Sequence, residues 1–176
     1  MKALVVYESL WGNTEQVARS IAAGLQQHLD VSVVDVTEAP VAIPDDVALT
    51  VVGGPTHAFG LSRPQTRQDA FRQGATQGNQ DVGVREWLSQ LHADGHSGPV
   101  AAFDTRVEKV RRLPGSAAKK AAKLVRREGF ASASEPESFY VSDTSGPLVE
   151  GELDRAREWG AQLGQDALHQ TSRTRH

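Results

Sequence analysis

One short polar segment of the sequence combines the residue types that bind an anion. The string ESLWGNT, residues 8–14, follows a β-branched run and precedes residues with helical periodicity. It offers the hydroxyls of Ser9 and Thr14, the amide of Asn13 and the flexible backbone of Gly12, but no lysine. Because a helix N-terminus presents free N–H groups and a positive dipole end, the segment suits a terminal phosphate. An ordinary helix start, with Ser9 and Thr14 as turn and cap residues, would use the same side chains.

Three other kinds of loop are excluded at this position. A nucleoside triphosphate loop needs Gly-Lys-Ser/Thr at the helix start, whereas this sequence has Gly-Asn-Thr. A dinucleotide fingerprint needs G-x-G-x-x-G after the strand, and the segment has one glycine. A receiver domain needs acidic residues at the ends of its first and third strands, whereas the third apolar run ends in Gly53–Gly54.

The elements around this segment alternate between strand and helix patterns. Apolar runs predict five strands, at residues 1–7, 31–36, 47–54, 99–104 and 137–142. Periodicity and capping signals predict helices at residues 14–29, 64–72, 84–92, 114–128 and 147–168. We therefore expect one α/β domain, residues 1–168, with a parallel sheet covered by helices on both faces and a disordered tail at 169–176. Such sheets bind ligands at the carboxyl ends of their strands, where residues 8–14 fall.

The segment between the third and fourth strands is longer than one helix needs. Within it, residues 73–83 are rich in glycine and carry almost no apolar side chain. This composition predicts a mobile surface excursion, which is either inert or a docking or lid element.

Composition narrows the classes of function. The 176 residues contain no cysteine, which excludes disulfides, thiolate metal sites and dithiol redox chemistry, so any redox chemistry needs a bound cofactor. The six histidines show no metal-ligand spacing, and we expect no metal site. No apolar run could span a bilayer and no signal peptide is recognisable, so we expect a cytoplasmic protein without membrane contact. The basic helix lacks interleaved aromatic residues, so we expect no nucleic-acid partner.

The opening segment resembles the signature of the flavodoxin family. That signature has two aliphatic residues and an aromatic, a Ser/Thr, a small residue, a Thr, and then a helical Ala and an aliphatic. The matching residues are Val5, Val6, Tyr7, Ser9, Gly12, Thr14, Ala18 and Ile21. The later segments VVGGPTHAFG and FDTR…LPGSAAK are also similar to small flavodoxin-family proteins, so the resemblance covers essentially the whole chain.

The resemblance implies a doubly wound flavodoxin-like fold, with five parallel strands in the order 2-1-3-4-5. It also implies FMN held by three loops, of which the first takes the phosphate and the other two enclose the isoalloxazine ring. The cofactor-binding residues so implied are Ser9, Leu10, Trp11, Gly12, Asn13, Thr14, Pro55, Thr56, His57, Ala58, Phe59, Gly60, Asp104, Thr105 and Arg106. No catalytic side chain is required, because the flavin performs the chemistry.

Three functions are compatible with these residues. The favoured one is an electron carrier that docks a redox partner protein. The second is an NAD(P)H-dependent quinone or flavin reductase, in which Arg111 and Arg112 would grip the phosphate of a pyridine nucleotide. The third is a flavodoxin-like binding module that has lost FMN.

The charge distribution departs from the acidic surface of typical flavodoxins. Residues 106–128 contain nine Lys/Arg and two Glu, although the net charge of the chain is -3. If Arg106, Lys109, Arg111 and Arg112 flank the flavin, they stabilise its anionic reduced form. We therefore expect the flavin to be reduced to its hydroquinone more easily than in low-potential flavodoxins.

Overall fold

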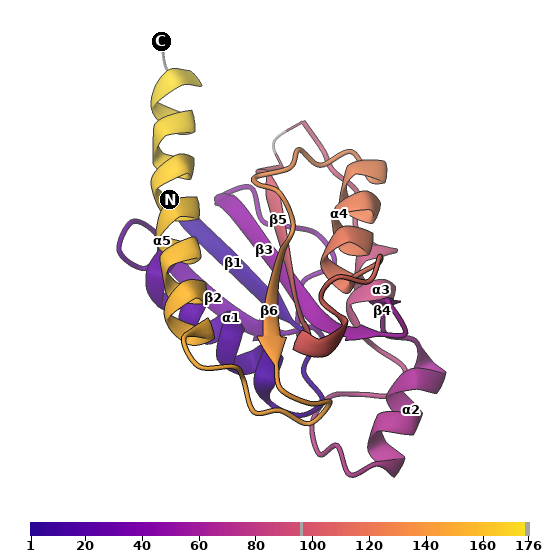
Figure 1. Cartoon of the computed structure of the whole chain (residues 1–176). Helices are drawn as coiled ribbons and strands as arrows, with labels where there is room; N and C mark the ends of the chain where they lie inside the picture. The colour runs from indigo at the N-terminus through magenta and orange to yellow at the C-terminus, as the bar shows by residue number, and fades with distance from the viewer. Residues whose placement is uncertain (96, 175–176) are drawn as a thin grey trace.

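The computed structural model of the chain describes residues 1–95 and 97–174 and shows a parallel sheet between two layers of helices (Figure 1). The strands are β1 (Lys2–Tyr7), β2 (Asp30–Asp35), β3 (Val47–His57), β4 (Gly60–Leu61), β5 (Val100–Val107) and β6 (Glu137–Val141). The helices are α1 (Asn13–Leu25), α2 (Pro64–Arg72), α3 (Val84–Leu88), the 3-10 turn η1 (Glu108–Val110), α4 (Ala117–Arg127) and α5 (Glu152–Thr174).

The sheet has the strand order β2-β1-β3-β5-β6, and every pairing along this path is parallel. Strand β4 is not part of this order, because its two residues pair only with the end of β3, in the antiparallel direction. When β4 is left out of the count, this is the predicted order 2-1-3-4-5, so the doubly wound fold is confirmed.

The two faces of the sheet carry separate apolar cores. Alternate strand residues such as Val5 and Val51 pack under α1 and α5, whereas their neighbours Val6 and Val52 pack under α3 and α4. This alternation follows from the period of two in a strand and explains why the buried strands are apolar throughout.

Helices α1 and α5 pack with their backbones almost in contact. An added Cβ on Gly24 would lie 2.0 Å from the carbonyl oxygen of Arg157, and one on Gly160 would lie 2.1 Å from that of Ile21. Glycine is therefore required at both positions. The close packing fixes α1, whose N-terminus is the predicted phosphate site.

Two strands run further than the apolar pattern predicts. Strand β3 continues to His57, and β5 continues to Val107 because it keeps pairing with β6, as in the pair Val107–Val141. Residues Asp104–Arg106 therefore lie inside β5, and the prediction that they form a loop is wrong.

The C-terminal region also differs from the expectation of a disordered tail at 169–176. Helix α5 continues to Thr174, and the hydroxyls of Thr171 and Ser172 donate to carbonyl oxygens one turn earlier. Residues 175–176 lie outside the described residues. In the part of the chain that the structure describes, no helix combines the length and apolar character needed to cross a membrane.

Candidate functional site

The start of α1 has the features of an anion site. Gly12 precedes the helix with φ near +90°, a left-handed conformation that glycine adopts without steric cost. Its amide donates to the Ser9 hydroxyl at 3.1 Å, which closes the loop. The N–H groups of the first turn of a helix lack intrahelical partners, and in α1 no side chain caps them.

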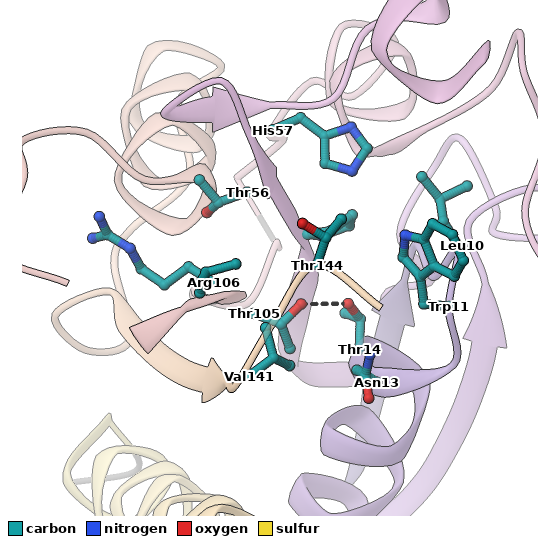
Figure 2. Close-up of a pocket in the computed structure, with 12 residues that line it drawn as sticks. Leu10, Trp11, Asn13, Thr14, Thr56, His57, Thr105, Arg106, Val141 and Thr144 are labelled. Carbon is teal, nitrogen blue, oxygen red and sulfur yellow. Dashed lines mark hydrogen bonds between the residues drawn. The ribbon is translucent and has the colours of Figure 1, made fainter. Parts of the chain in front are cut away.

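Thr14 connects this helix start to the centre of the sheet. It is 2% exposed, and its Oγ1 lies 2.7 Å from Oγ1 of Thr105 on β5, as the dashed line in Figure 2 shows. Asn13 donates through its side-chain amide to the carbonyl oxygen of Ser145, in the segment after β6. The helix start therefore lies against the carboxyl ends of both β5 and β6.

The glycine-rich segment 73–83 packs on the candidate phosphate loop. The Gln77 amide donates to the carbonyl oxygen of Leu10 at 3.2 Å. Gly78 approaches so closely that an added Cβ would lie 2.6 Å from the Leu10 side chain and 2.9 Å from the Ser9 carbonyl oxygen. Leu10 is also buried against Ala75. Although most of its side chains are exposed, this segment packs on the candidate phosphate loop and is not a free excursion.

A buried ionic cluster attaches this insertion to Glu8, the first residue of the candidate phosphate loop. Arg67 of α2 is 0% exposed, and its guanidinium lies 3.9 Å from the carboxylate of Glu8 and 2.8 Å from that of Glu86. The Ser62 hydroxyl accepts from Arg67 and donates to Glu8. The Val84 amide donates to Glu8 at 2.8 Å. Burial raises the pKa of the Glu8 carboxyl, and these hydrogen bonds oppose the rise.

The second predicted loop is the hairpin between β3 and β4. Ala58 and Phe59 form its turn with φ of 46° and 63°, a left-handed pair that usually selects Asn-Gly. Each such non-glycine residue costs about 1–2 kcal/mol, and Phe59 leaves its ring 49% exposed. The surrounding structure therefore holds the hairpin tip in a strained shape, as is common at ligand sites.

His57, the last residue of β3, is held as a neutral imidazole. Its Nδ1 lies 3.0 Å from the Thr66 hydroxyl on α2. Burial lowers its pKa to about 4, and the positive charge of Arg67 adds to the effect. At neutral pH the ring is therefore an uncharged hydrogen-bonding wall of the site.

Asp104 and Thr56 direct their side chains to the start of α4. The Asp104 carboxylate, 0% exposed, accepts from the Ala118 amide at 2.9 Å and from the Thr56 hydroxyl at 3.0 Å. The Thr56 hydroxyl in turn accepts from the Ala117 amide. Burial raises the pKa of Asp104, opposed by its hydrogen bonds. Both side chains therefore fix α4 against the sheet.

Arg106 points its charge away from the other site residues. Figure 2 shows its side chain extending away from Trp11. Its guanidinium donates to the carbonyl oxygens of Val110 and Leu113, at 2.8 and 3.2 Å. The residue is 6% exposed, and its two hydrogen bonds help to order the basic loop that follows β5.

A cavity of about 70 Å³ lies where these elements meet (Figure 2). The residues that line it are Leu10, Trp11, Asn13, Thr14, Pro55, Thr56, His57, Thr105, Arg106, Val107, Val141 and Thr144. The indole Nε1 of Trp11 is buried and has no hydrogen-bond partner among the described residues. Adjoining cavities of about 270 and 300 Å³ share Trp11 and Thr144 with it.

The structure brings together members of all three predicted segments. Ser9 and Gly12 shape the loop behind the cavity, and Ala58, Phe59 and Gly60 line a neighbouring cavity. The prediction omitted three lining residues, which are Val107, Val141 and Thr144. The sequence could have indicated them, because ligands of parallel sheets bind at the carboxyl ends of strands and these residues follow or end the fourth and fifth predicted strands.

Comparison with known proteins agrees with this geometry. A family model described as flavodoxin matches residues 5–98, which is more than half of the chain. The chain belongs to the flavodoxin family. Membership of this family implies a flavin cofactor.

Solved structures show the same fold at low sequence identity. A flavodoxin from the domain Archaea aligns with a TM-score of 0.63 and 18% identity, over 96% of this chain and 100% of that one. Oxidised flavodoxin 2 from Bacillus cereus aligns with a TM-score of 0.65 and 15% identity, over 94% and 99%. The flavodiiron protein from Giardia intestinalis aligns with a TM-score of 0.62 and 18% identity, over 96% of this chain but 36% of that one. No curated protein matches significantly.

The residues of this flavodoxin fit the two ends of a flavin nucleotide. The uncapped start of α1 and the Thr14 hydroxyl are donors suited to a phosphate. The unpartnered indole N–H of Trp11 offers a further donor, and Pro55, Val107 and Val141 add apolar surface beside it.

Proposed function

We propose that this flavodoxin binds FMN at the carboxyl ends of β1, β3 and β5 and passes electrons from it to a redox partner protein. The uncapped start of α1 beside a cavity lined by an indole is the observation that carries this proposal. Both features occur at the edge of the sheet where parallel folds bind ligands.

The phosphate end relies on hydrogen bonds instead of a counter-charge. Residues 8–14 contain no lysine or arginine, so the N–H groups of the first turn of α1 and its dipole supply the attraction. The Thr14 hydroxyl, now bonded to Thr105, can turn to donate to a phosphate oxygen. The Ser9 hydroxyl is occupied by the Gly12 amide and shapes the loop.

The ring end requires space that Trp11 and Thr144 control. A cavity of about 70 Å³ is far below the roughly 300–1,000 Å³ of typical ligand sites. These two side chains also border the adjoining cavities, so we expect the ring to enter between them. Neutral His57 lines the same space and adds no charge to it.

When bound, the flavin supplies the electron transfer itself. The chain positions and shields it, and no side chain has to act as an acid or base. Arg111 and Arg112, the residues of the reductase alternative, are exposed, and Arg111 lies 3.8 Å from the carboxylate of Glu108. This geometry gives the alternative no support at that position.

A fluorescence titration tests the proposal. FMN and riboflavin are titrated separately with flavin-free protein, and we expect quenching by FMN at sub-micromolar protein and weaker binding of riboflavin. Thr14→Val removes one hydroxyl donor to a charged phosphate, so FMN affinity should fall about tenfold while riboflavin affinity is unchanged. Thr171→Val on α5 serves as the matched control and should leave both affinities unchanged.

The absence of quenching at tens of micromolar protein would contradict the proposal and favour the binding-module alternative. Equal binding of FMN and riboflavin would contradict the assignment of residues 8–14 to the phosphate.

A further inference from the structure

A second and larger cavity lies beside the β3–β4 hairpin. It has a volume of about 400 Å³ and is enclosed by the hairpin, the start of α2, α3 and the loop before α4. His57 lines both this cavity and the one in Figure 2, so the two cavities are neighbours. We call it the basic cavity, because the cations Arg63, Arg85 and Lys120 line it.

Of the three cations of the basic cavity, Arg85 is partly buried, and Arg63 and Lys120 are exposed. Its lining contains no Asp or Glu. Within residues 1–95 and 97–174, none of its three cations forms an ion pair, whereas the buried Arg67 and the partly buried Arg155 both do. Burial lowers the pKa of Arg85, and the nearby charge of Arg63 adds to this, whereas the carboxylates of Glu86 and Glu8, which lie outside the cavity lining, oppose it. Three like charges around one space repel one another, and an anion between them would relieve that repulsion.

The cavity wall is also held in place before any ligand binds. The Arg85 guanidinium donates to the carbonyl oxygens of Leu61 and Ser62, at 3.0 and 3.3 Å. Gly115, with φ near +89°, packs on the hairpin tip so closely that an added Cβ would lie 2.7 Å from the Phe59 carbonyl oxygen. A fixed guanidinium loses little freedom when it binds an oxyanion, which favours binding.

We propose that the basic cavity binds a phosphorylated nucleotide through its phosphate groups. Three cations match the multiple charges of phosphate or diphosphate better than a single carboxylate. The volume lies within the range of nucleotide-sized ligands. Binding of the nucleotide in the basic cavity does not require a bound flavin. If FMN occupies the neighbouring cavity, as the proposed function holds, the nucleotide would approach it past His57.

Isothermal titration calorimetry at low ionic strength tests this assignment. The full chain is saturated with FMN, so that the loop at residues 8–14 does not compete, and is titrated with pyrophosphate, adenosine 2′,5′-bisphosphate and NADPH. We expect binding of the bisphosphate and NADPH that is tighter than that of pyrophosphate. The double variant Arg63→Gln/Lys120→Gln should weaken all three by about tenfold or more.

Lys123→Gln/Arg126→Gln removes two exposed charges from the same helix layer outside the cavity and should leave the affinities within about twofold. Equal losses in both double variants would overturn the proposal, because they would show general charge attraction. Pyrophosphate binding as tight as that of the nucleotides would also overturn it, in favour of a free-phosphate site. If the chain does not bind FMN, the proposed function fails, but the nucleotide proposal is still decided by whether the cavity variants weaken nucleotide binding. The two proposals can therefore fail separately.

Discussion

At the residue scale, His57 is the group that both cavities share. Its ring is enclosed between β3 and α2, hydrogen-bonded to Thr66 and close to the buried charge of Arg67. These neighbours oppose protonation, so the imidazole adds hydrogen-bonding capacity to the site without adding charge. A charged ring here would instead add to the positive charge of the basic cavity and to the cost of burial.

The lowered pKa of His57 makes stability depend on pH. Its pKa is about 4 in the folded chain against 6.5 ordinarily, so the unfolded chain binds more protons between these values. The contribution of His57 to stability is therefore complete above pH 6.5 and is lost as the pH falls towards 4, by about 3 kcal/mol in all. Urea unfolding at pH 7.5 and 4.5 should show a smaller loss for His57→Gln than for the wild type. The exposed-residue control His169→Gln should follow the wild type, and an identical loss in all three proteins would contradict the assignment.

At the scale of elements, the insertion between β4 and β5 is attached to the phosphate loop at two places. The Arg67–Glu8 cluster fixes its base, and the packing of Gly78 on Leu10 fixes its middle. Residues 8–14 are therefore supported by a segment nearly seventy positions away in the sequence. We therefore expect the position of the proposed phosphate site to depend on the insertion as well as on α1.

Removal of Arg67 should loosen the insertion. Arg67→Met leaves Glu8 buried without its cation, and breaking a buried pair in this way costs about 3–5 kcal/mol. Chemical unfolding should show this loss, and hydrogen exchange should quicken in residues 73–83. Arg72→Met, one turn further along α2, removes an exposed arginine paired with Asp69 and should cost less than about 1 kcal/mol. Similar losses for the two variants would contradict a special role of Arg67.

The contact between segment 73–83 and the phosphate loop can be tested with two glycines. Gly78 and Gly74 both have positive φ, but only an added methyl at Gly78 meets Leu10 and the Ser9 carbonyl, whereas Gly74 has open space around it. Both substitutions by alanine should cost about 1 kcal/mol of backbone strain. Only Gly78→Ala should also weaken FMN binding, several-fold in the fluorescence titration, and unchanged affinity would show that the contact does not support the site.

At the scale of the whole molecule, charge is divided between two regions. The chain carries a net charge of -3, yet residues 106–128 hold nine Lys/Arg against two Glu. Most of these cations face solvent on α4 and the loop before it. The structure reduces the expected effect on the hydroquinone, because the Arg106 guanidinium donates to two carbonyl oxygens. Arg111, which does not line the cavity in Figure 2, lies 3.8 Å from the carboxylate of Glu108. We therefore expect the basic region to attract anionic groups from solution more than it tunes the ring.

The salt dependence of electron transfer distinguishes local charge from net charge. Oxidation of the reduced, FMN-loaded protein by ferricyanide should slow several-fold as ionic strength rises, because the basic face attracts the anion and salt screens it. The net charge of -3 alone predicts the opposite sign. Lys119→Gln/Lys123→Gln should flatten the dependence. A rate that rises with salt in stopped-flow measurements would contradict steering by the basic face.

The order of the elements and the parallel α/β architecture could be predicted from the sequence, and residues 8–14 stand out in it as the candidate phosphate loop. These follow from local patterns, because strand and helix periods, Gly12 and the hydroxyls of Ser9 and Thr14 act within a few residues of one another. Only the tertiary structure decided which side chains reach the cavity. The extension of β5 by pairing with β6 directed the Asp104 carboxylate to the start of α4 and placed Val107 and Val141 at the cavity, and the fold laid residues 73–83 on the loop. The direction of a strand residue depends on register with its partner, and a contact between distant segments depends on how they pack, which no local pattern contains.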